Sequence, residues 1–193
     1  MQFVKDQFSE TYEIKKSKFI AYFFPYNNFN NIMEQLKKEH PKARHHVYAY
    51  RYLNEFDQVA ENCSDDGEPK GTSGKPSLAV LSGQNIINSA VIIVRYFGGI
   101  KLGTGGLVKA YSDAVNLVLS KSELYPYIKL KRKYLVLDYH NLSKVEYQIE
   151  HLDISIVTKE FLSDVKLILE ASNEEFNKLQ KLIPRELNLL DAN

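Results

Sequence analysis

The polar segment SDDGEPKGTSGKP, residues 64–76, holds three carboxylates within four positions: Asp65, Asp66 and Glu68. Carboxylate oxygens are the ligands that Mg²⁺ and Ca²⁺ prefer. The spacing is not that of a calcium-binding loop, in which acids occupy alternate positions ahead of a distant glutamate. Carboxylates this close repel one another unless a cation neutralises them. Two interpretations therefore stay open, pairing with cations of the chain itself and binding of a metal ion.

A second segment, GGIKLGTGG at residues 98–106, lies between an apolar strand and a helix. A helix start offers unpaired N–H groups, and glycines let a phosphate approach the backbone closely. The spacing matches neither G-x-G-x-x-G nor a P-loop, which disfavours a nucleotide-binding enzyme of those types. The alternative is that these glycines serve turns and helix packing alone. The candidates for contact with phosphate or nucleic acid are Arg51, Lys75, Arg95, Lys101, Gly103, Gly105, Gly106 and Lys109.

A run of tyrosines follows in HHVYAYRY, residues 45–52, where alternation places Tyr48 and Tyr50 on one face of a strand. Together with Tyr96 they could stack single-stranded bases. We favour the alternative, cross-strand aromatic packing. There is no G-x-S-x-G motif, and two neighbouring histidines with one cysteine do not make a structural zinc site. We therefore expect no cofactor and no catalytic residue.

The overall charge points to no particular partner. The 193 residues include 25 basic and 24 acidic side chains, so nucleic acid or a membrane surface would have to be held by a local patch. No stretch approaches the roughly 20 apolar residues of a membrane span. Charge interrupts the first residues, so we expect no secretory signal. The single cysteine, Cys63, fits a reducing cytoplasm.

Apolar periodicity predicts the elements that position these groups. Pro126 and the charged residues after it mark a boundary between domains 1–125 and 126–193. In the first domain we expect an extended stretch over 12–24, a helix between Asn28 and Pro41, and a strand over 45–52. A short helix over 76–84, a buried strand over 89–97 and a helix with an apolar stripe from Leu107 to Val118 follow.

The second domain reads as a strand over 134–139, a helix with Leu142 and Val145 on its apolar face, and a hairpin over 153–171. A last helix begins after Ser172, which forms a capping box with Glu175. This βαββα order is typical of a ferredoxin-like domain. The fold class is therefore α+β.

Two segments that are informative together are SDDGEPKGTSGKP (64–76) and VRYFGGIKLGTGGLVKAYSDAV (94–115), here called the first and second signature segments. With HHVYAYRY and SKFIAYFFP they resemble the bacterial YigZ family, whose N-terminal domain is shared with the eukaryotic IMPACT proteins. The resemblance covers nearly all of residues 1–125. It implies an N-terminal fold like the second domain of ribosomal protein S5, and a ferredoxin-like C-terminal domain. It also implies a role in translation, because the eukaryotic relatives regulate translation through protein contacts. It supplies no catalytic residues.

Both signature segments are expected at one end of the same sheet, where the three acids would orient Lys75, Arg95 and Lys101. We therefore predict a non-enzymatic, cytoplasmic, translation-associated module that binds structured RNA or the ribosome. Two alternatives stay open: a protein-interaction regulator of translation or of a stress response, and a metal-dependent hydrolase built on Asp65, Asp66 and Glu68. The geometric requirement is that Asp66 and Lys101 lie at the same end of the molecule.

Overall fold

The computed structural model describes residues 1–192, and the chain forms two compact units. Unit 1 comprises Met1–Tyr127, and unit 2 begins at Ile128. The sequence-based boundary at Pro126 lies close to this division. Within residues 1–192, no helix combines the length and the apolar character needed to cross a membrane.

The framework of unit 1 is a five-stranded antiparallel sheet. Its order is β2 (Phe8–Ile14), β3 (Ser17–Pro25), β6 (Ser89–Tyr96), β4 (His45–Leu53) and β5 (Val59–Ser64). The central strand, β6, is buried along its whole length except at Tyr96. It is covered on both faces, which explains its continuous apolar sequence.

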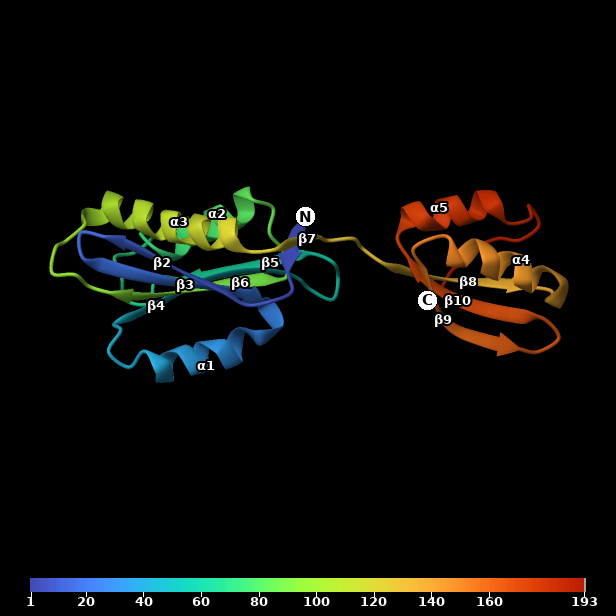
Figure 1. Cartoon of the computed structure of the whole chain (residues 1–193), viewed down its shortest axis with the longest axis horizontal. Coiled ribbons are helices and arrows are strands. Elements are labelled where there is room, and N and C mark those ends of the chain that lie inside the picture. Colours follow the sequence, from blue (N-terminus) through green and yellow to red (C-terminus); the bar gives the residue numbers. More distant parts are fainter. Residues whose placement is uncertain (193) are drawn as a thin grey trace. The chain divides into compact units, whose positions relative to one another are not determined.

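Helices cover both faces of this sheet (Figure 1). On one face lie α2 (Gly74–Gly83) and α3 (Gly103–Lys121), and the α3 residues Leu107, Tyr111 and Val115 share a core with Val47 and Ile93 of the sheet. On the other face lies α1 (Phe29–Glu39), preceded by the short 3₁₀ turn η1 (Tyr26–Asn28). The N-terminal strand β1 (Gln2–Val4) pairs with β7 (Leu124–Pro126) at the end of the unit. The predicted helices of this unit are confirmed.

The structure corrects the sequence-based prediction at two places in the sheet. The extended stretch over 12–24 is a hairpin, because Lys15 and Lys16 adopt φ values of 46° and 62° and reverse the chain between β2 and β3. Left-handed turn positions normally carry glycine or asparagine, so two lysines gave no signal. Strand β5 was not predicted either, because it is a polar edge strand without a buried face.

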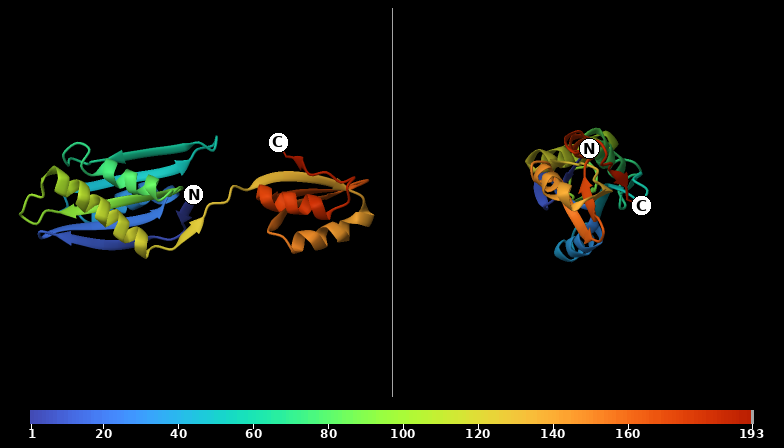
Figure 2. Two further views of the ribbon diagram at one scale, coloured as in Figure 1. Left: turned by 90° about the horizontal axis from the view of Figure 1, so that it is seen from above. Right: turned by 90° about the vertical axis from the view of Figure 1, so that its right-hand side faces the viewer.

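Unit 2 is a four-stranded antiparallel sheet with both helices on one face (Figures 1 and 2). The chain runs through β8 (Lys131–Leu137), α4 (Tyr139–Glu150), β9 (Ile154–Phe161), β10 (Val165–Ala171), α5 (Asn173–Leu182) and β11 (Leu190–Asp191). The sheet order β11–β8–β10–β9 is that of the split β-α-β fold. As expected, the Ser172 hydroxyl accepts a hydrogen bond from the Glu175 N–H at 3.2 Å and caps α5. The α+β class is confirmed.

Candidate functional site

A buried ion pair lies where the two signature segments meet. The carboxylate of Glu68, whose side chain is 3% exposed, accepts a hydrogen bond from the Arg95 guanidinium and another from the Tyr111 hydroxyl at 2.9 Å. Glu68 comes from the first segment, Arg95 from β6 and Tyr111 from α3. Burial, and then the charge of Glu68, raises the pKa of Tyr111, so the hydroxyl remains a donor. The guanidinium is therefore held in one place from inside the protein.

Asp65 shapes the first signature segment. Its carboxylate accepts hydrogen bonds from the backbone N–H groups of Gly71, Ser73 and Gly74 and from the Ser73 hydroxyl, at 2.7–3.1 Å. Two of these N–H groups belong to the start of α2, so Asp65 caps that helix from eight and nine residues away. Burial alone would raise the pKa of Asp65, but the hydrogen bonds outweigh it and hold the pKa below the usual value of 3.8.

Asp66 fastens the same segment to the start of β4. Its carboxylate accepts a hydrogen bond from the His46 backbone N–H. Its own carbonyl oxygen lies 2.8 Å from Nδ1 of His45. Because a carbonyl oxygen can only accept, His45 carries a proton on Nδ1, and its Nε2 lies 3.9 Å from Glu68. The three acids thus bind three different parts of unit 1.

An open cavity of about 430 Å³ lies against the ion pair and is called here the Arg95 pocket. Three cations line it, namely Arg44 before β4, Arg95 at the end of β6 and Lys101 before α3, against a single carboxylate, that of Glu68. The other lining residues are His45, Pro69, Phe97, Leu102, Gly103, Thr104 and Leu107. The lining therefore has an excess of positive charge.

Two sets of hydrogen-bond donors at this pocket are not used by the fold. Nε of Arg95 is buried and has no hydrogen-bond partner within residues 1–192. Helix α3 begins at Gly103, and its N-cap residue, Leu102, has no side chain that could accept from the first-turn N–H groups. Unpaired donors of this kind, at the positive end of a helix dipole, can bind an anion.

The sequence-predicted residues divide into those at the pocket and those elsewhere. Glu68, Arg95, Lys101 and Gly103 line the pocket, and Asp66 contacts the neighbouring start of β4. Asp66 and Lys101 therefore belong to the same end of unit 1. Gly105 and Gly106 also belong to the first turn of α3, but neither of them lines the pocket.

Three predicted cations lie away from this pocket, which corrects the predicted grouping. Arg51 pairs with Glu61 at 2.9 Å. It lies opposite Ser89 at the start of β6, and Ser89 is about 20 Å along that strand from Arg95. Lys75 lines a separate depression beside Val80 and Val108. Lys109 is exposed and pairs with Asp113 one turn along α3 at 3.0 Å.

The tyrosines do not form an open platform for bases. Tyr48 and Tyr50 lie under α1, each with its ring centroid 5.1 Å from that of Phe29. The Tyr96 hydroxyl lies 2.9 Å from Nδ1 of His40. These contacts are sheet-to-helix aromatic packing, and they occupy the rings that base stacking would need.

Sequence reasoning missed several pocket residues. Arg44 had no signal beyond its charge, and His45 was considered only as a zinc ligand. Tyr111 was assigned to the apolar stripe of α3, where its ring indeed packs 5.0 Å from that of Phe19, but its hydroxyl reaches Glu68. The apolar run predicts Phe97 as the last residue of a buried strand, yet it is 53% exposed at the pocket. A phenylalanine directly before two glycines was the available signal.

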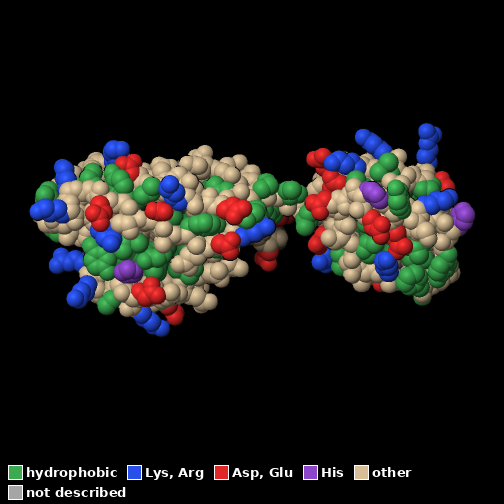
Figure 3. Space-filling view, in the orientation of Figure 1, with side chains coloured by type: hydrophobic (Ala, Val, Ile, Leu, Met, Phe, Trp, Pro, Cys, Tyr) green, Lys and Arg blue, Asp and Glu red, His purple; other side chains and the backbone are tan. Residues whose placement is uncertain are grey.

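The three acids do not converge on one point. Each is bound by different donors of the protein, and within residues 1–192 no group of three or more His, Cys, Asp or Glu side chains is arranged to hold a metal ion. On the face shown in Figure 3, basic and acidic side chains are interspersed on each unit. On this face an anion would therefore be held locally rather than by a broad basic surface.

Comparison with known proteins identifies the family of this chain. The family model described as the Impact N-terminal domain matches residues 15–119. An IMPACT family member from Haemophilus influenzae is 39% identical over 167 residues, which are 84% of this chain and 80% of that protein. IMPACT family member YigZ of Escherichia coli is 39% identical over 158 residues, or 80% and 78% of the two chains. A crystal structure described as that of a hypothetical protein shares 34% identity and a TM-score of 0.66, with 100% and 97% of the two chains covered. The chain therefore belongs to the IMPACT family.

Proposed function

We propose that this chain is a non-enzymatic, translation-associated binding module whose Arg95 pocket holds the phosphate backbone of structured RNA, free or within the ribosome. The observation that carries the proposal is the state of Arg95. Its side chain is 8% exposed, one edge of the guanidinium is bound to Glu68, and Nε has no partner within residues 1–192. Burying a charge and leaving one of its donors unpaired is costly. Because Nε is buried, an incoming anion would reach that donor through a small shift of the guanidinium.

The start of α3 supports the same interpretation. Gly103 needs to be glycine because its φ is +74°, but Gly105 has no positive φ, and a Cβ there would meet nothing within 4 Å. The fold itself therefore does not require glycine at position 105. Close approach of a ligand to the backbone of this turn is a physical reason for glycine there. Phosphate contacts of this type position nucleic acid without reading its sequence.

The pocket offers a surface for binding, and the serine of the first signature segment, Ser73, does not line it. Ser73 is fully buried, and its hydroxyl donates to Asp65 at 2.7 Å. The carboxylates that could have held a metal are occupied by donors of the protein. The association with translation rests on family membership. We also propose that the protein is cytoplasmic, which the free thiol of Cys63 supports.

A salt titration of RNA binding tests the proposal. A fluorescein-labelled RNA hairpin is titrated with the full chain and with the variants Lys101→Ala and Arg44→Ala, and fluorescence anisotropy is recorded at several salt concentrations. Each variant should weaken binding to all sequences alike and reduce the slope of log K against log[salt] by about 1. Lys38→Ala removes the same charge from the exposed surface of α1 and should change neither quantity. Equal behaviour of all three variants would reject the RNA site.

The second candidate, a protein-interaction regulator, is favoured by one observation. Phe97 and Ile100 in the loop before α3 are 53% and 46% exposed, which is unusual for two large apolar side chains so close in sequence. A pull-down with the tagged chain, with and without nuclease, separates the two functions. Partners that survive nuclease treatment and are lost in Phe97→Ser would favour direct protein contact.

A further inference from the structure

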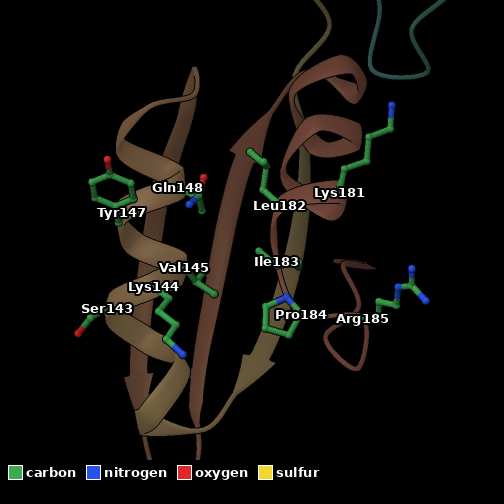
Figure 4. A pocket seen from close by; sticks show the side chains of 10 residues that line it. All are labelled: Ser143, Lys144, Val145, Tyr147, Gln148, Lys181, Leu182, Ile183, Pro184 and Arg185. Atoms are coloured by element: carbon green, nitrogen blue, oxygen red, sulfur yellow. The ribbon is translucent and has the colours of Figure 1, made fainter.

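We propose that the groove between α4 and α5 of unit 2 binds a short acidic segment of a partner protein, with an apolar side chain of that segment inserted between the two helices. Figure 4 shows the groove and the residues that line it. Its volume is about 700 Å³. The groove belongs to unit 2, so the inference does not depend on the RNA site of unit 1.

The floor of the groove is aliphatic. Val145 of α4 and Ile183 after α5 are buried between the helices, and Pro184 lies beside them (Figure 4). At the edges, Tyr147 and Leu182 are 59% and 52% exposed. Large apolar side chains that remain in water around a concave surface indicate a binding site, because covering them removes apolar area from solvent.

The rim of the groove is basic. Lys144 extends from α4, while Lys181 and Arg185 lie on the outer side of α5 with their side chains directed away from α4 in this view, and no carboxylate is among the lining residues (Figure 4). None of these three cations forms an ion pair within residues 1–192. Three unpaired positive charges around an apolar floor are complementary to a segment that is both acidic and apolar.

Three of the four acids on these two helices face other partners. On α4, Glu146 pairs with Lys159 of β9. On α5, Glu174 and Glu175 both pair with Lys178, at 2.9 and 2.7 Å. Glu150 at the end of α4 and Glu186 next to Arg185 form no ion pair within residues 1–192, but neither lines the groove, so the charged side chains of the lining itself are all positive.

Peptide fits the groove better than nucleic acid does. Single-stranded nucleic acid is held by aromatic side chains on which successive bases stack, and the groove offers one such ring, that of Tyr147. The floor of the groove is aliphatic, which suits a leucine or isoleucine of a peptide. The half-buried amide of Gln148 adds a donor and an acceptor for a peptide backbone. An apolar floor with polar groups beside it is how a hydrophobic groove typically recognises the apolar face of a peptide.

Photo-crosslinking tests both the site and the chemistry of its occupant. The full chain is produced in its native cells with a benzophenone-bearing phenylalanine in place of Tyr147, irradiated, digested and analysed by mass spectrometry. The expected adduct is a protein fragment with net negative charge and at least one large apolar residue, and it should be lost in the double variant Lys144→Glu/Lys181→Glu. An adduct with RNA, with lipid, with a second copy of this chain or with a fragment that is not acidic would overturn the proposal, as would the absence of any adduct.

The affinity of the captured sequence is then measured with a fluorescein-labelled synthetic peptide. Lys181→Glu should weaken its Kd at least about fivefold, since it replaces an attraction by a repulsion at the rim. Leu182→Ser should weaken binding through loss of apolar contact. The matched control is Lys131→Glu, an exposed lysine of unit 2 outside the groove, which should change Kd less than about twofold. Thermal unfolding by circular dichroism checks that all variants are folded, and equal Kd values for Lys181→Glu and the control would refute the site.

Discussion

Replacement of Glu68 by glutamine tests the centre of the proposed RNA site. Glu68→Gln keeps the shape of the side chain and an oxygen acceptor but removes the charge that holds Arg95 and Tyr111. The positive charge of Arg95 would then remain buried without an ionic partner. We expect unit 1 to lose a large part of its stability.

The magnitude follows from the burial of the pair. Both side chains are more than nine-tenths buried, at 3% and 8% exposure. Removal of one partner of such a pair typically costs about 3–5 kcal/mol. The glutamine oxygen can still accept one hydrogen bond, so we expect the lower end, about 3 kcal/mol. For a unit of this size that corresponds to a fall in Tm of about 12 °C.

Differential scanning calorimetry of the full chain measures this effect, because the two units should unfold in separate transitions. The matched control is Glu61→Gln, which breaks the Arg51 ion pair at a carboxylate that is 45% exposed and should cost less than about 1 kcal/mol. The transition of unit 2 is an internal reference that should not move. If Glu68→Gln lowers the Tm of unit 1 no more than Glu61→Gln does, the buried pair does not have the role assigned to it.

Four further outcomes follow from the contacts of unit 1. Tyr111→Phe keeps the ring packing and removes one hydrogen bond to a charged acceptor, which should cost about 1.5–3 kcal/mol in urea unfolding. The folded pKa of Asp65 is depressed, so its carboxylate stabilises unit 1 above its ordinary pKa of 3.8, and this contribution is lost as pH falls below that value. Asp65→Asn should abolish this part of the acid dependence in unfolding curves measured from about pH 5 to 2. Burial lowers the pKa of His46 below 6.5, so stability should decline as pH falls through 6.5, and His46→Gln should flatten that decline. A Cβ at Gly98 would lie 2.0 Å from the Lys16 backbone, so Gly98→Ala should greatly lower the Tm or prevent folding, whereas Gly105→Ala should raise stability by up to about 1 kcal/mol.

The sequence was sufficient for the elements with strong periodicity. The run SAVIIVRYF could be assigned to a buried central strand because only a strand covered on both faces is apolar without interruption. The stripe from Leu107 to Val118 predicted the covering helix, and the capping box at Ser172 predicted the start of α5. These signals are local, and each is contained within one element.

The site was only partly predictable, because it is assembled from distant residues. Ser73 stands at the N-cap position of α2, but its hydroxyl donates to Asp65, and it is Asp65, eight and nine residues away, that accepts from the first N–H groups. Arg51 and Arg95 are both arginines of neighbouring strands, and only the antiparallel register of β4 and β6 shows that they lie at opposite ends. Residue type alone could not separate them.

The three acids of the first signature segment explain why this loop is both polar and ordered. Asp65 binds the start of α2, Asp66 binds the start of β4, and Glu68 binds Arg95 and α3, so each negative charge fixes a different part of unit 1. The charge of Glu68 is compensated by Arg95, and the carboxylates of Asp65 and Asp66 are directed at backbone N–H groups and do not line the pocket. Among residues 1–192, Nε of Arg95 has no hydrogen-bond partner and the first turn of α3 has no side-chain cap at the same place. A loop rich in acidic residues can therefore support a site for a negatively charged partner.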